Sequence, residues 1–172
     1  TEKEYPCDTL ILSVGLIPEN ELTWMAGAKQ DDGTKGASVD ENFQTTVPGV
    51  FAAGNVLHVH DLVDFVSMEA EALADGAARY IKEGALPDCG LAITGDSMVG
   101  QLTPARFSGT GNVTVSFRMR KPVRNCTVEL WQGDHLVKQK KFPKALPAEM
   151  IQIALKPEEL NEKDNLEVRV VC

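Results

Sequence analysis

The sequence predicts an α/β segment over residues 1–88 and a small all-β, sandwich-like domain over residues 95–172. Three observations predict this division. The first half holds short apolar runs and one long alanine-rich helical pattern, whereas the second half alternates apolar and polar residues. The charge balance also changes, because residues 1–88 carry 5 Lys/Arg against 16 Asp/Glu, and residues 89–172 carry 12 against 9. We place the boundary near residues 87–95.

Two short apolar runs predict strands in the first half. Residues 9–14 are apolar and partly β-branched, and Gly15 follows them, which indicates a buried strand and then a turn. Residues 50–53 follow the turn residues Pro48 and Gly49 and lack polar alternation. Such a run is typical of a strand that is covered on both faces.

Residues 61–81 predict a helix, because apolar side chains recur in them at helical spacing. Asp61, Asp64 and Ser67 are each candidate N-caps, and Gly84 is expected to end the helix. The many alanines predict close packing against a sheet.

From Cys89 onward the periodicity changes to that of strands. Residues 113–119, 126–132 and 166–170 alternate, with turn signals between them, which predicts about six strands in a sandwich. Trp131 is expected in the sandwich core. Three lysines are expected to protect a strand edge from pairing: Lys138, Lys140 and Lys141.

Composition excludes several classes of protein. No apolar run approaches the roughly 18–20 residues that span a bilayer, and no apolar stretch follows the charged N-terminus, so we expect no signal peptide and a cytoplasmic location. The four cysteines form no C-x-x-C, which argues against a zinc ribbon or a vicinal redox disulfide. The acidic first half is a poor surface for nucleic acid. The chain does not begin with Met, so we expect it to be part of a longer protein.

Residues 45–56 read T-T-V-P-G-V-F-A-A-G-N-V and carry the chemical signal. They predict a turn, a buried strand and then a loop toward a helix, at the sheet edge where α/β folds bind ligands. Gly54 lets a ligand approach the backbone closely. Asn55 can donate to and accept from hydroxyls or a phosphate. The helix that follows directs backbone N–H groups and positive potential at the ligand.

This stretch resembles the second FAD-binding motif of the pyridine nucleotide–disulfide oxidoreductase superfamily, which includes thioredoxin reductase-like enzymes. The pattern T-x-x-P-G-[VI]-[FY]-A-x-G-D matches at Thr45, Pro48, Gly49, Val50, Phe51, Ala52 and Gly54. Asn55 stands where the family usually has an Asp that hydrogen-bonds the flavin ribityl chain, so the acceptor oxygen is kept and the charge is lost. Residues 10–22 are similar to the family's A-T-G-x-x-P-N segment.

The resemblance covers roughly residues 5–84 and implies that the α/β segment is the end of an FAD-binding three-layer fold. The parent protein would be a flavin-dependent oxidoreductase that passes hydride between NAD(P)H and FAD. The implied FAD contacts are Gly54, Asn55 and Val56, together with the N–H groups of Ser67, Met68 and Glu69 at the start of the helix. No catalytic acid, base or redox cysteine is assigned.

Both of the family's G-x-G-x-x-G motifs are missing from the sequence, including the one that holds the nicotinamide cofactor. We therefore expect the NAD(P)H site to lie outside this chain. We also expect the chain alone to be inactive and to bind FAD weakly or not at all.

Residues 58–64 place two imidazoles and two carboxylates close together: His58, His60, Asp61 and Asp64. Zinc uses such ligands, but usually with helical or C-x-x-C spacing, so we predict no metal site. A solvated loop with a helix cap is the favoured interpretation. A substrate or flavin-edge role for His58 and His60 is the alternative.

A second hypothesis is a non-catalytic interaction module, in which the β domain docks a partner subunit or mediates dimerisation. The expected partners are the rest of the parent chain, a second copy or another subunit. Without the neighbouring strands of the parent, residues 50–53 would expose apolar strand edges. This predicts oligomers or a rearranged first half.

Overall fold

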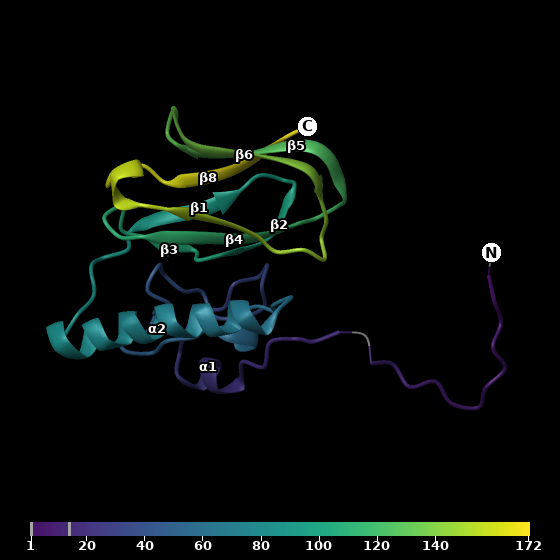
Figure 1. Ribbon diagram of the computed structural model, residues 1–172. Helices are drawn as coiled ribbons and strands as arrows, with labels where there is room; N and C mark the ends of the chain where they lie inside the picture. The colour runs from purple at the N-terminus through teal and green to yellow at the C-terminus, as the bar shows by residue number, and fades with distance from the viewer. Residues whose placement is uncertain (1, 14) are drawn as a thin grey trace.

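The computed structural model describes residues 2–13 and 15–172 and shows two layers (Figure 1). One layer holds helix α1 (Glu21–Met25), the short 3₁₀ turn η1 (Gly54–Val56), the long helix α2 (Val63–Glu83) and the loops that connect them. The other layer holds all eight strands, and α2 runs beneath it (Figure 1). The chain is therefore mixed α and β, with most of its regular structure in strands.

The strand layer consists of two sheets. A five-stranded sheet has the order β3-β1-β8-β5-β6, and a three-stranded sheet has the order β2-β4-β7. The pairs are antiparallel except β1 with β8, which are parallel. The strand bounds are β1 Leu91–Gly95, β2 Val99–Thr103, β3 Arg106–Phe107, β4 Val113–Met119, β5 Val123–Gln132, β6 His135–Ala145, β7 Ile151–Leu155 and β8 Leu166–Val171.

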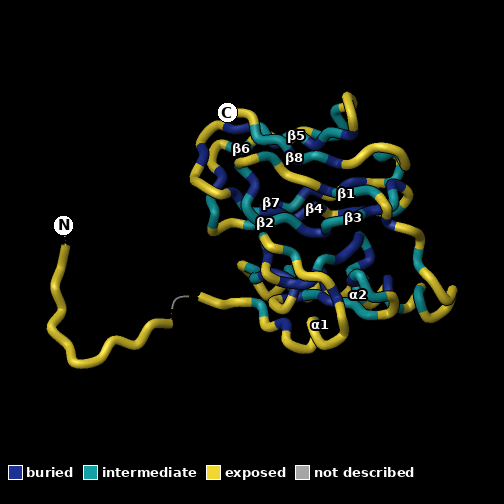
Figure 2. The backbone as a smooth tube through the Cα atoms, turned by 180° about the vertical axis from the view of Figure 1, so that it is seen from behind, coloured by how far each residue is buried: buried dark blue, intermediate teal, exposed yellow. Residues whose placement is uncertain are grey.

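One apolar core joins the two sheets. Phe117 of β4, Leu130 of β5, Leu155 of β7 and Leu166 of β8 are each almost wholly buried in it. The alternation in β4, β5 and β8 puts every second side chain into this core, because successive strand residues point to opposite faces. Figure 2 shows buried segments in the strands, and further ones in the loops of the helix layer. The strand-rich second half agrees with the sequence, while its assignment to a sandwich stays a prediction.

The outer face of the strand layer corrects one expectation and confirms another. Trp131 does not enter the core: its Nε1 donates to Glu129 on the outer face, and the Arg169 guanidinium lies 5.1 Å from the ring centroid. A ring can be half-covered by a charged neighbour instead of by the core. β6 lies at the edge of its sheet and carries Lys138, Lys140 and Lys141, as the sequence predicts.

Two predicted strands are absent from the described part of the chain. Residues 9–13 form no strand, and the exposed fractions of Leu10, Ile11 and Leu12 are 74%, 86% and 72%; residue 14 lies outside the described residues. Residues 50–53 make only an isolated bridge, between Gln44 and Phe51. A covered strand needs a hydrogen-bonding neighbour on its edges, and the described residues supply none to residues 9–13 and a single bridge to residues 50–53.

Helix α2 forms as predicted but spans Val63–Glu83, and Gly84 caps its end in the left-handed conformation at φ 80°. Leu62 occupies the N-cap position without a side-chain hydrogen bond, so none of the three predicted capping residues caps the helix. Most of the alanines are exposed. Only Glu69 and Gly76 are buried among the helix residues, which marks the face that lies toward residues 41–54.

Gly76 permits the close approach of α2 to the preceding loop. A Cβ placed on Gly76 would lie 2.6 Å from the Asn42 carbonyl oxygen, well inside van der Waals contact. The absence of a side chain therefore fixes how near the helix lies to residue 42.

We expect Gly76→Ala to destabilise the chain by about 1–3 kcal/mol, because the steric clash exceeds the roughly 1 kcal/mol that alanine gains in helix propensity. Urea unfolding followed by tryptophan fluorescence measures this change. Gly90→Ala is the matched control, since the nearest atom to its Cβ would be 3.9 Å away. Equal stabilities of the two variants would contradict the close approach.

Candidate functional site

The turn at Gly54 brings the tip of residues 50–53 against helix α2. Gly54 is buried and adopts φ +71°, a left-handed conformation that other residues rarely take. Its N–H donates to Glu69 Oε1 over 2.6 Å. The apolar residues Ala52 and Leu57 pack on either side of this turn in a small separate core. The turn and the helix therefore lie side by side, as the predicted ligand site requires.

Glu69 gathers two imidazoles as well as the Gly54 N–H. Its Oε2 lies 2.8 Å from His58 Nε2, in hydrogen-bonding geometry, and 3.2 Å from His60 Nε2. The His60 nitrogen lies off the hydrogen-bonding direction and has no hydrogen-bond partner among the described residues, so its contact with Glu69 is electrostatic. The two imidazole rings are 4.2 Å apart between centroids.

This network is almost closed to solvent. The exposed fractions of the His58, His60 and Glu69 side chains are 0%, 2% and 7%. Burial alone would raise the pKa of Glu69, but the contacts with His58, His60 and the Gly54 N–H outweigh burial and lower the pKa of Glu69 to about 2. The carboxylate is therefore ionised wherever the protein is folded near neutral pH.

Both histidine side chains are thus buried, whereas residues 61–64 are exposed, so the favoured interpretation of a solvated loop is wrong for the histidines and holds for the residues after them. Residue spacing does not indicate that Glu69, in the second turn of α2, meets both imidazoles. Asp61 and Asp64 do not join them. Asp61 instead pairs with Arg118, and Asp64 is exposed in the first turn of α2.

Arg118 of β4 clamps this loop to the strand layer. Its guanidinium donates to the Val59 carbonyl over 2.9 Å and to Asp61 Oδ1, and also to the Ala148 carbonyl over 2.7 Å. Asp61 Oδ2 in turn accepts the Met150 N–H over 2.7 Å. Partial burial raises the pKa of Asp61, but the hydrogen bonds from the Met150 N–H and from Arg118, together with the positive charge of Arg118, outweigh burial. The pKa of Asp61 is therefore lowered. The β layer therefore fixes the position of the histidine loop.

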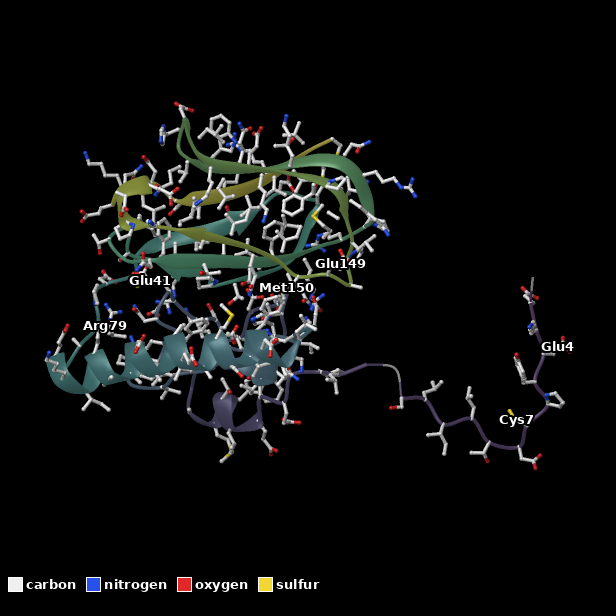
Figure 3. All side chains as sticks on the ribbon, viewed as in Figure 1. Glu4, Cys7, Glu41, Arg79, Glu149 and Met150 are labelled. Carbon is white, nitrogen blue, oxygen red and sulfur yellow. The ribbon has the colours of Figure 1, made fainter. Side chains whose placement is uncertain are left out.

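A second set of contacts joins the layers at the other end of α2. Glu41 accepts hydrogen bonds from the hydroxyl and the N–H of Ser108, over 2.6 and 3.1 Å. The Ala105 N–H donates to the Val39 carbonyl over 2.9 Å. Figure 3 shows Glu41 and Met150 in the space between the helix layer and the strands. The two layers are therefore joined at separated points along the helix.

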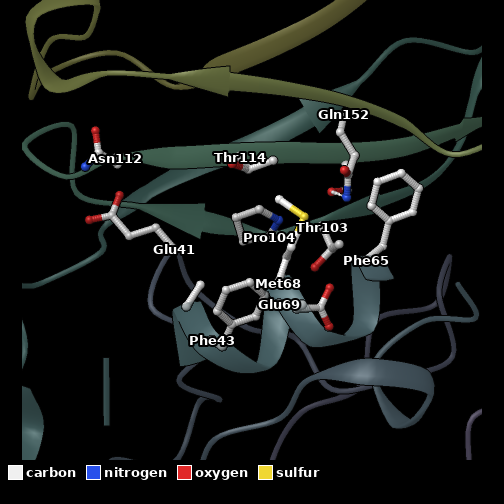
Figure 4. A pocket seen from close by; sticks show the side chains of 12 residues that line it. Glu41, Phe43, Phe65, Met68, Glu69, Thr103, Pro104, Asn112, Thr114 and Gln152 are labelled. Carbon is white, nitrogen blue, oxygen red and sulfur yellow. Dashed lines mark hydrogen bonds between the residues drawn. The ribbon is translucent and has the colours of Figure 1, made fainter. Parts of the chain in front are cut away.

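Between these contacts lies a cavity of about 290 Å³. Phe65, Met68 and Glu69 of α2 face Thr114 of β4 and Gln152 of β7 across it (Figure 4). Apolar side chains make most of its wall, and Glu69 brings the one carboxylate that also belongs to the histidine network. The cavity is partly open to solvent.

The six predicted FAD contacts fall into two groups. Gly54 and Glu69 are hydrogen-bonded to each other and buried, whereas Asn55, Val56, Ser67 and Met68 are exposed. Because α2 begins at Val63, residues 67–69 lie in its second turn, where N–H groups bond within the helix. The expectation that these N–H groups stand at the helix start is therefore wrong. The contacts with FAD themselves stay predictions.

Residues 1–78 match the sequence profile of the family described as "Pyridine nucleotide-disulphide oxidoreductase". This part of the chain is therefore similar to that family, as the motif over residues 45–56 implies. Two curated relatives are similar: a ferredoxin–NADP reductase from Leuconostoc mesenteroides subsp. mesenteroides, 33% identical over 76 residues, and the glutamate synthase [NADPH] small chain of Escherichia coli (strain K12), 29% identical over 87 residues.

The matched stretches cover 42% and 48% of this chain but only 23% and 18% of the two relatives. The chain thus spans about a fifth of the length of the oxidoreductases it matches. No solved structure matches the chain. In the described part of the chain, neither α-helix has the length and hydropathy that crossing a bilayer would need.

We expect Glu69→Gln to destabilise the chain by about 1–3 kcal/mol, because the amide places donors where a buried carboxylate accepts from His58. Urea unfolding at neutral pH measures the loss. Glu71→Gln is the matched control, since Glu71 is exposed on the same helix. If both variants unfold at the same urea concentration as the parent sequence, the buried carboxylate does not hold this site together.

We expect Arg118→Ala to release the histidine loop while the strands stay folded, because four acceptors lose their shared donor. Amide hydrogen exchange of residues 57–62 should quicken by about tenfold or more. Arg124→Ala, which removes an exposed arginine from strand β5 of the other sheet, should leave that exchange unchanged. Unaltered exchange in Arg118→Ala would rule out the clamp.

Proposed function

We propose that the parent protein is a flavin-dependent oxidoreductase that passes hydride between NAD(P)H and FAD, and that this chain supplies one wall of the FAD site. The observation that carries the proposal is the turn at Gly54, held against α2 by Glu69, within the family's motif over residues 45–56. The names of the two relatives, a ferredoxin–NADP reductase and an NADPH glutamate synthase subunit, support nicotinamide-linked chemistry.

The residues around the turn suit a sugar or phosphate group of FAD. Asn55 is exposed, and its Oδ1 accepts the His60 N–H over 3.1 Å, while the hydrogen bonds of the described residues leave its Nδ2 as a free donor. A ribityl hydroxyl or a phosphate oxygen can accept from that amide. Bound FAD would supply the redox chemistry, and Gly54, Asn55 and Val56 would orient its chain.

The chain by itself lacks most of such a site. Apolar side chains of residues 10–12, 16 and 17 are strongly exposed, as expected of segments whose packing partners lie elsewhere in the parent. We propose that the chain alone neither binds FAD tightly nor oxidises NAD(P)H. The rest of the parent chain is the proposed partner of these apolar segments.

A second candidate function is an interaction or dimerisation module. The observation that favours it is the core of the strand layer, which is complete within residues 91–170 and separate from the small core around Leu57. The parent protein without residues 89–172 distinguishes the two roles: if it still oxidises NAD(P)H but changes its oligomeric state, the strand layer is an interaction module.

We expect the parent protein to purify with FAD and this chain to purify without it. In the parent, Asn55→Leu should weaken FAD binding by about tenfold, because one hydrogen bond to a polar group contributes about 1–1.5 kcal/mol. Asn55→Asp, which restores the family's usual residue, should bind FAD at least as tightly as the parent sequence. Titration of flavin fluorescence measures both affinities.

Two results would contradict this assignment. One is stoichiometric FAD binding by the chain alone, and the other is equal FAD affinity of the Leu and Asp variants in the parent. The chain holds neither dinucleotide-binding motif, so its sequence does not indicate a preference for NADH or NADPH. Both are therefore tested separately as electron donors.

A further inference from the structure

His58, His60 and Glu69 converge on one point in the interior. One nitrogen or oxygen ligand atom from each lies within 4.8 Å of the other two. The two imidazoles come from the loop before α2, and the carboxylate comes from the second turn of the helix. Sequence spacing does not show this convergence, since the third group lies nine residues beyond the second.

The protein alone leaves this cluster incompletely bonded. His60 Nε2 is buried and lies 3.2 Å from Glu69 Oε2, yet it makes no hydrogen bond among the described residues. An unmade hydrogen bond at a buried polar atom costs about 1–3 kcal/mol. A cation bound between the three groups would accept the lone pair of this nitrogen and remove that cost.

We propose that His58 Nε2, His60 Nε2 and Glu69 Oε2 form a binding site for a divalent transition-metal ion of the zinc type. Two imidazole nitrogens and one carboxylate oxygen are a ligand set that zinc uses. The separations of 2.8 and 3.2 Å between these atoms approach the roughly 3.3 Å that tetrahedral ligands keep at bond lengths of about 2.0–2.2 Å. The third separation, between the imidazole nitrogens, is within 4.8 Å, so small side-chain rotations bring the three atoms around one ion.

The surroundings hold the three ligands in place. The Gly54 N–H donates to Glu69 Oε1, which leaves Oε2 directed at the imidazoles. Hydrogen bonds of this kind orient carboxylate ligands and support metal affinity. Arg118 anchors Asp61, the residue after His60, so the loop that carries both imidazoles is fixed at its far end.

The metal takes the place of the proton on His58 Nε2. Each imidazole coordinates through Nε2 as the neutral tautomer, which carries its one proton on Nδ1. Three protein ligands leave a fourth position, and Glu69 also lines the open cavity beside α2. Water from that cavity can fill the fourth position.

The test uses the whole chain, first stripped with EDTA and then titrated with ZnCl₂ by calorimetry and with CoCl₂ by visible absorption. We expect one ion per chain and the visible bands of four-coordinate cobalt. We also expect a higher Tm in saturating zinc, because a ligand that binds only the folded state stabilises it. Neither measurement involves flavin, so this inference and the proposed FAD role fail independently.

Variants locate the ion. His60→Ala should lower zinc affinity by about tenfold or more and abolish the cobalt bands, because it removes one of three ligands. His60→Gln gives a second variant of similar size, and circular dichroism checks that each is folded. His135→Ala is the matched control, since His135 is exposed on β6 and is the remaining histidine of the sequence.

Two outcomes overturn the proposal: no zinc binding by the stripped chain, or zinc binding that the folded His60 variants retain at the affinity of the His135 control. In either case the three side chains form a hydrogen-bonded network without a metal. The site is supported if the His60 variants lose one-to-one zinc binding while the His135 control keeps it.

Discussion

The carboxylate of Glu69 is the group on which the arrangement of the first layer depends. It is buried and ionised, and it takes the Gly54 N–H on one oxygen and the two imidazoles on the other. A buried charge is tolerated only where such partners replace water. The same three contacts also fix the turn that ends the motif over residues 45–56, so the carboxylate links the stability of the layer to the proposed ligand site.

The strand layer adds a constraint that the helix layer cannot provide by itself. Arg118 holds the histidine loop from one side, and Ser108 holds Glu41 near the other end of α2. The two cores are separate, yet polar contacts join the layers at both places. A change in the strand layer can therefore reach the Gly54 turn through the loop, without any contact between the sheet core and the turn.

The sequence predicted what depends on local pattern. The alternation in β4, β5 and β8 and the helical repeat in α2 appear directly as spacing, and the motif around Gly54 appears as ordered residue types. Residues 9–13 and 50–53 could not be judged in this way, because a strand exists only where a neighbour pairs with it. Trp131 was misplaced because alternation shows that a strand has two faces without showing which face is buried.

The role of Glu69 could not be found from spacing either. Its partners lie 11 and 15 residues away, across a loop whose path depends on Arg118 from a different layer. An acidic residue in an alanine-rich helix is normally a solvated one. The only local signal was a pair of histidines before a helix, and that pattern does not identify the group they face.

The most direct test of this account is to measure the chemical shift and the solvent exchange of the Gly54 amide proton by NMR. A short hydrogen bond to a buried carboxylate predicts a strongly downfield proton shift and slow exchange with solvent, and both should be lost in Glu69→Ala but kept in Glu71→Ala. An ordinary shift with rapid exchange in the unsubstituted chain would show that the turn is not held by this carboxylate, and the central claim would be wrong.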